Sequence, residues 1–179
     1  QKQGSLEQKI SSLYRSAMDS TRRNSDGWQP LKPVIEQIHS IKDKKEYQIV
    51  MAELNRKGID AMMFNLGVDA DIHHAQMNLV NISQGGLSMG ERDYYLKDDT
   101  ATVKVREAYK KYVKTLLQMV GNDEPTAQKK METVLRLETQ IAKPSYSAVK
   151  LRDVEGNYHK LSYAQLVKDY PTIDWGNIF

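Results

Sequence analysis

Cysteine is absent from this chain of 179 residues, and proline and glycine are scarce, at five and ten residues. The absence of cysteine excludes disulfide bonds and thiolate metal sites. No apolar run approaches the roughly 18 residues that a membrane-spanning helix requires. An excess of one charge sign is lacking too, because 26 Lys and Arg against 23 Asp and Glu give a net charge of +3. That balance is too mild, and too well mixed along the chain, to indicate a nucleic-acid partner.

The remaining composition is that of an ordinary folded chain, with 40% hydrophobic and 27% charged residues. The length allows one domain, with or without an appended element, and enough apolar residues are present to bury a core. The chain begins with Gln1 and carries no signal peptide, so the sequence itself gives no cellular location. No internal repeat and no low-complexity segment is present.

Three helices are predicted in the first third of the chain. A capping box at residues 5–8 begins the first helix, and turn residues at 24–27 are expected to end it. Pro30 and Pro33 suit the entry to the second helix, where a missing N–H costs nothing. The third helix is expected from about residue 44 to residue 56, with an apolar stripe along one side.

The next stretch changes to a period of two. Apolar and small or polar residues alternate over residues 61–68, and a second strand is predicted at residues 77–82. The mostly polar residues between them would form the turn of a β-hairpin. Because an isolated hairpin is marginal in water, this one needs a helix or another sheet to cover it.

Two long helices dominate the rest of the chain. Thr100 begins the first, with helical apolar spacing for about four turns up to Gly121. Pro125 marks the start of the second and Pro144 its end. Their short polar connection predicts antiparallel packing, and a short helix follows near residues 162–168. The fold class is therefore mainly α, a helical bundle-like fragment with one β-hairpin and a Gly-rich turn.

The segment at residues 81–96, between the hairpin and the long helices, combines three glycines with an Arg-Asp pair and two adjacent tyrosines. The glycines allow positive φ angles or close backbone approach, and the pair next to two large rings indicates a fixed polar corner. A structural turn at the core edge is the main interpretation. A phosphate-binding loop is the alternative, although both characteristic glycine spacings are absent. The predicted turn or interface residues are Gly85, Gly86, Arg92, Asp93, Tyr94 and Tyr95.

Glu138 stands on the apolar stripe of the second long helix, between Leu135 and Ile141. A buried carboxylate is costly unless it is paired, so we expect Glu138 to bond a basic side chain or a backbone donor. A catalytic carboxylate is the alternative, but no nucleophile and base arrangement accompanies it.

Histidines and aspartates near the hairpin turn are the other candidates for chemistry. His73 and His74 are adjacent, so they point to opposite sides and do not easily chelate one metal ion; we expect exposed turn residues. Asp69 and Asp71 could share a face and hold calcium, but the full calcium-loop pattern is missing. They are expected to end the strand and bond turn amides.

The central segment resembles a motif of a known family. QGGLSMGERDYYL at residues 84–96 is similar to the GLGLPxRDYY segment of the neprilysin family of zinc endopeptidases, which includes endothelin-converting enzymes and bacterial oligopeptidase O. Further similar stretches follow in the family's order and cover nearly the whole chain: LYRSAMD (13–19), LKP (31–33), VDAD (68–71), LETQIA (137–142), LSYAQL (161–166) and IDW (173–175).

The resemblance implies that residues 1–179 are part of the N-terminal helical domain of such a peptidase. The family's His-Glu-x-x-His zinc motif is missing, so the catalytic zinc domain lies outside this chain, and neither catalytic residues nor metal ligands are expected here. The parent would be a zinc metalloendopeptidase that hydrolyses short peptides, and this region its non-catalytic cap. Its partners would be the missing catalytic domain and peptide substrates. The lack of cysteine suggests a bacterial member, and the family a periplasmic or cell-surface location. A stand-alone helical interaction module is the alternative.

Overall fold

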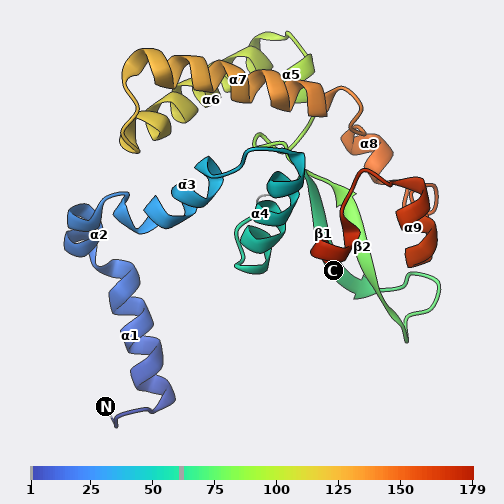
Figure 1. The fold of residues 1–179 in the computed structure, drawn as a ribbon, viewed down its shortest axis with the longest axis horizontal. Helices are drawn as coiled ribbons and strands as arrows, with labels where there is room; N and C mark the ends of the chain where they lie inside the picture. The colour runs from blue at the N-terminus through green and yellow to red at the C-terminus, as the bar shows by residue number, and fades with distance from the viewer. Residues whose placement is uncertain (1, 61–62) are drawn as a thin grey trace. The chain divides into compact units, whose positions relative to one another are not determined.

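The computed structural model of the protein describes residues 2–60 and 63–179. Contacts divide the chain into two compact units, Gln1–Ser40 and Ile41–Phe179. Within the described residues, helices dominate and the only sheet has two antiparallel strands, as the labels in Figure 1 show. The predicted mainly α fold with one hairpin is confirmed.

The first unit consists of short helices. Ser5 caps the first helix and accepts from the backbone N–H of Gln8, as the capping box predicts. The expected end of this helix at 24–27 is wrong, because Asp19 interrupts it earlier. The Asp19 carboxylate accepts from the backbone N–H of Arg22 at 2.9 Å and so caps a second helix. The elements are α1 Leu6–Met18, α2 Ser20–Asp26, the 3-10 turn η1 Gln29–Leu31 and α3 Lys32–His39.

The second unit opens with α4 (Lys44–Arg56), whose bounds match the prediction. The hairpin follows as β1 (Phe64–Ala70) and β2 (Asn78–Gln84). Each strand extends two residues beyond its predicted end, because the pairing continues at both ends of the ladder. The predicted start of the first strand, residues 61 and 62, lies outside the described residues.

After the hairpin, the chain forms α5 (Asp93–Leu96), α6 (Thr100–Met119) and α7 (Glu124–Ala142). Helices α6 and α7 pack side by side, joined by residues 120–123, as predicted (Figure 1). Helix α6 begins at Thr100, as predicted, where Asp99 caps it through the backbone N–H of Thr102, and it ends at Met119, two residues before Gly121. Among the described residues, no helix is long and apolar enough to cross a bilayer.

The C-terminal part forms α8 (Ala148–Leu151), α9 (Tyr163–Asp169) and α10 (Trp175–Ile178). Trp175 is buried, and its ring lies 6.0 Å from that of Phe64 at the start of β1. Helix α10 packs against α4. This part therefore covers one end of the hairpin.

Candidate functional site: the glycine-rich corner

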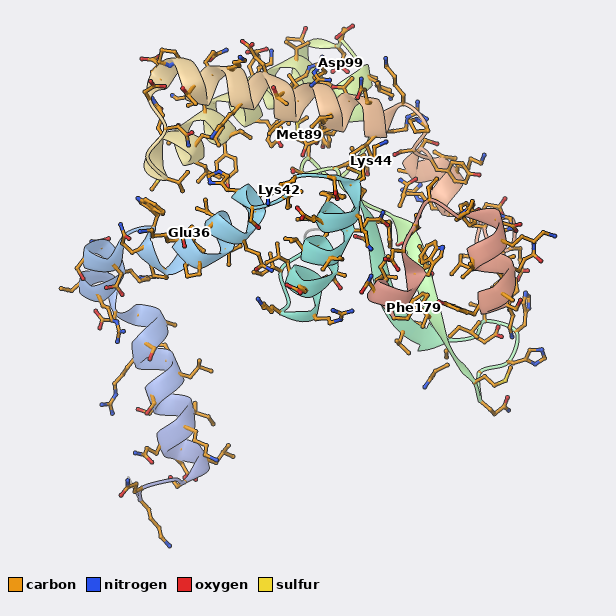
Figure 2. The ribbon with its side chains drawn as sticks, viewed as in Figure 1. Glu36, Lys42, Lys44, Met89, Asp99 and Phe179 are labelled. Carbon is orange, nitrogen blue, oxygen red and sulfur yellow. The ribbon has the colours of Figure 1, made fainter. Side chains whose placement is uncertain are left out.

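The glycine-rich segment turns the chain from β2 into α5, and Met89 within it is labelled in Figure 2. A Cβ atom on Gly85 would lie 2.8 Å from the Asn65 side-chain oxygen and 3.1 Å from the Asn65 backbone nitrogen. Gly86 has a φ of +76°, and a Cβ atom there would lie 3.2 Å from the Cα of Met63. Both glycines therefore allow the segment to pass close to the backbone at the start of β1.

Glu138 lies under this segment with 8% of its surface exposed. Its carboxylate accepts from three hydroxyl groups: Ser88 at 2.5 Å, Tyr95 at 3.0 Å and Tyr109 at 2.7 Å. These partners differ from the basic side chain or backbone donor that the sequence predicted. Three hydrogen bonds to the carboxylate offset its lost hydration, and no cation has to be buried with it.

Tyr95 connects this cluster to the backbone of the corner. Its hydroxyl accepts from the backbone N–H of Met89 at 3.0 Å while donating to Glu138. The backbone carbonyl of Tyr95 accepts from the Arg106 guanidinium at 2.8 Å. Burial raises the pKa of Tyr95 and raises that of Tyr109 to about 12, so both hydroxyls stay protonated and can donate to Glu138.

Arg92 and Asp93 fix the corner through separate partners and not through each other. The Arg92 guanidinium donates to the backbone carbonyl of Ser145 at 2.6 Å, which connects the corner to the segment that directly follows α7. The Asp93 carboxylate pairs with Lys97 at 2.7 Å, one turn further along. Tyr94 lies at the surface. The structure thus places the predicted motif residues around one corner, with Tyr95 at its buried centre.

A second buried carboxylate, Asp71, lies at the hairpin turn. It accepts from Lys160 at 2.7 Å, from the Tyr158 hydroxyl at 2.9 Å and from the backbone N–H of His73 at 2.9 Å. The hydrogen bond from the Lys160 ammonium, followed by that from His73, holds the pKa of Asp71 well below its usual range. The turn-amide bond was predicted from the sequence. The ion pair was missed, because Lys160 is remote in the chain and no local pattern links the two.

His73 and His74 do not form a shared site. His73 lies 3.4 Å from Glu155 and packs edge-on against Tyr158, while His74 is exposed. Asp69 is exposed too, and Asp71 is occupied by its own donors. Within residues 2–60 and 63–179, no three His, Asp or Glu side chains come together as metal ligands.

An open cavity of about 450 Å³ lies beside the corner. Several of the lining polar side chains have partners within the fold: the Asn65 amide donates to the Gln84 carbonyl, and Ser88 donates to Glu138. The Gln84 side chain exchanges two hydrogen bonds with the backbone of Tyr146. Three of the polar side chains that line the cavity are therefore engaged within the fold, and Asp60 lines it as well.

These features define a structural corner in a mainly helical protein, and comparison with known proteins gives the class. Endothelin-converting enzyme 1 of Bos taurus is 30% identical over 175 residues, which are 94% of this chain and 23% of that enzyme. Endothelin-converting enzyme-like 1 of Rattus norvegicus is 30% identical over 186 residues, covering 96% of this chain and 24% of that protein. The chain spans about a quarter of the length of these relatives.

Solved structures agree. The inhibitor complex of the Mycobacterium tuberculosis zinc metalloprotease Zmp1 superposes with a TM-score of 0.89 at 27% identity, over 98% of this chain and 26% of that one. PepO from Lactobacillus rhamnosis shares the fold with a TM-score of 0.76 at 20% identity, over 89% of this chain and 25% of that one. The family described as "Peptidase family M13" matches residues 1–179. This chain belongs to that family, the neprilysin family, and corresponds to its N-terminal region.

Proposed function

We propose that the chain is the non-catalytic N-terminal cap of a zinc metalloendopeptidase that hydrolyses short peptides. The family match over the entire chain carries this proposal, together with the similarity to Zmp1, which is described as a zinc metalloprotease. The family resemblance also favours a bacterial protein in the periplasm or at the cell surface.

The residues of this chain do not fit the zinc ion of such an enzyme. Catalytic zinc needs three protein ligands from His, Asp, Glu or Cys, and the described residues bring no such set together. The sequence contains neither cysteine nor a His-Glu-x-x-His motif. The zinc, and the base that would activate its water, therefore belong to another part of the peptidase.

The contribution of this region would be to shape the catalytic space. Two hydrogen bonds hold the corner between the hairpin and α6. Ser88 in the corner donates to Glu138 of α7, and Arg92 donates to the backbone carbonyl of Ser145. The hairpin leaves apolar residues uncovered, with Val68 at 68% exposed and its cross-strand partner Val80 also exposed. We infer that the hairpin and residues 85–96 lie at the boundary with the catalytic lobe.

Zinc analysis of two proteins tests the proposal. The chain of residues 1–179, after dialysis, should hold well under one equivalent of zinc and cleave no peptide. The full-length protein should hold about one zinc ion per chain, as an active site with a single catalytic zinc requires, and cleave short peptides in a chelator-sensitive way. Tight zinc or chelator-sensitive cleavage by residues 1–179 would contradict the proposal. A reading frame that ends soon after Phe179 would favour an interaction module instead.

Hydrogen exchange tests the boundary. In the chain of residues 1–179, hairpin amides should exchange faster than those near Leu116 in α6, because the hairpin has no third strand within the described residues. In the full-length protein, the hairpin amides should slow markedly. Hairpin amides that already exchange as slowly as those near Leu116 in the shorter chain would remove the support for a boundary there.

A further inference from the structure

Helix α6 carries a second apolar stripe that α7 does not cover. Val105, Tyr112 and Met119 lie seven residues apart, and Tyr112 and Met119 are 60% and 66% exposed. The half-buried Val113 and Leu117 lie on another side of the helix. The residues of the exposed stripe, spaced alternately four and three apart, are Ala101, Val105, Ala108, Tyr112, Thr115 and Met119.

This spacing is the heptad pattern of a helix that packs along another helix. A residue on the same side every 3.5 positions on average keeps one seam facing a partner along the whole length, and five of the six positions here are apolar, with Thr115 the exception. The stripe runs from the first turn of α6, which follows Asp99 (labelled in Figure 2), to its last residue, a length of about 27 Å at 1.5 Å per residue. A seam of this length fits a partner helix of four to five turns, roughly 18 residues.

The edge of the stripe is basic. Lys104 and Lys111 occupy the flanking positions of successive heptads on the side away from Val113. Both are exposed, and neither amino group forms an ion pair within the described residues. Flanking positions of a heptad seam pair with the partner helix by charge, so the matching helix carries acidic residues there.

A second copy of α6 fits poorly. In an antiparallel two-fold seam, equivalent flanking positions face each other, which would bring the Lys104 and Lys111 rows of the two copies together. In a parallel seam, they would face the positions of Tyr109 and Leu116, which carry no charge. Neither arrangement places an acidic side chain next to Lys104 or Lys111.

We propose that this stripe is the docking site of an acidic amphipathic helix from the same peptidase chain, outside residues 1–179. The chain spans about a quarter of the length of its relatives, so most of such an enzyme lies outside it. This inference rests on the proposed function and names a second surface, on α6, through which the cap contacts the rest of the enzyme, in addition to the hairpin and residues 85–96.

Zero-length cross-linking of the full-length protein tests the docking. A carbodiimide joins a lysine amino group to a carboxylate in direct contact, and mass spectrometry identifies the joined peptides. Lys104 or Lys111 should couple to an Asp or Glu outside residues 1–179, and a mixture of heavy and light protein should show the link within one molecule. The variant with Lys104→Arg and Lys111→Arg is the matched control, since it keeps both charges but cannot couple.

Oxidation of Met119 gives an independent measurement. In the full-length protein, hydrogen peroxide should oxidise Met119 at least about tenfold more slowly than in the urea-unfolded chain, because a covered thioether is protected. Oxidation as fast as in the unfolded chain would show a bare stripe and overturn the docking. Links found only between molecules, or only to residues within 1–179, would overturn it too. If the full-length protein is a zinc-dependent peptidase but oxidises rapidly at Met119 or lacks the expected cross-link, the docking proposal fails and the proposed function stands.

Discussion

Replacing Glu138 by alanine removes the acceptor that three hydroxyl groups share. Ser88, Tyr95 and Tyr109 would lose the carboxylate to which each now donates. A hydrogen bond to a charged group contributes roughly 1.5–3 kcal/mol, and three that share one carboxylate are not additive. The buried Tyr95 hydroxyl and the half-buried Tyr109 hydroxyl would be left without an acceptor, and together with the small cavity they bring the expected loss of unfolding free energy to about 3–5 kcal/mol.

Thermal unfolding of residues 1–179, followed by far-ultraviolet circular dichroism, measures this loss. For a chain of this size, 1 kcal/mol shifts the melting temperature by roughly 2–4 °C, so Glu138→Ala should melt about 6–20 °C lower. Glu138→Gln should lie between the alanine variant and the wild type. Its amide keeps the shape and one acceptor oxygen but turns an NH₂ group towards hydroxyls that now donate.

Glu132→Ala is the matched control on the same helix. Glu132 is exposed and bonds only Gln128 among the described residues, so its replacement should change the unfolding free energy by no more than about 0.5 kcal/mol. A shift of one or two degrees for Glu138→Ala, comparable to the control, would refute the reasoning. It would mean that the hydroxyl cluster does not hold the corner against α7.

Two further substitutions test the other contacts of the hairpin. Asp71→Asn should lower the melting temperature at pH 7, and the difference from the wild type should shrink as the pH falls below about 4. The pKa of Asp71 is depressed in the folded state, so its stabilisation is present above the unfolded value and lost on acidification. A difference that is equal at pH 7 and pH 3 would contradict this. Gly85→Ala should destabilise by about 1–3 kcal/mol, because its Cβ would lie 2.8 Å from the Asn65 side chain. Gly67→Ala, in the middle of β1 with no atom within 4 Å of the added Cβ, is the matched control and should be near neutral; equal effects would rule out the close approach.

The sequence by itself determined the elements whose signals are local. The capping box at Ser5, the stripe of α4 and the two long helices with their short connection depend on residues within a few turns of each other. The hairpin is local too, since its strands are neighbours in the chain. The predicted end of the first helix was wrong, because an Asp can lie within one helix or cap the start of the next. The hydrogen bond that Asp19 accepts from the Arg22 backbone N–H shows that it caps α2.

The tertiary structure decided which distant groups meet. The stripe position of Glu138 indicated burial, but its partners come from the corner, from α5 and from α6, which only packing brings together. Asp71 looked like an ordinary turn residue until the fold placed Lys160 and Tyr158 against it. A local pattern records which side chain will be buried, because burial follows from helical or strand periodicity. It does not record what satisfies that side chain, because the donor can stand anywhere in the chain and is selected by three-dimensional proximity.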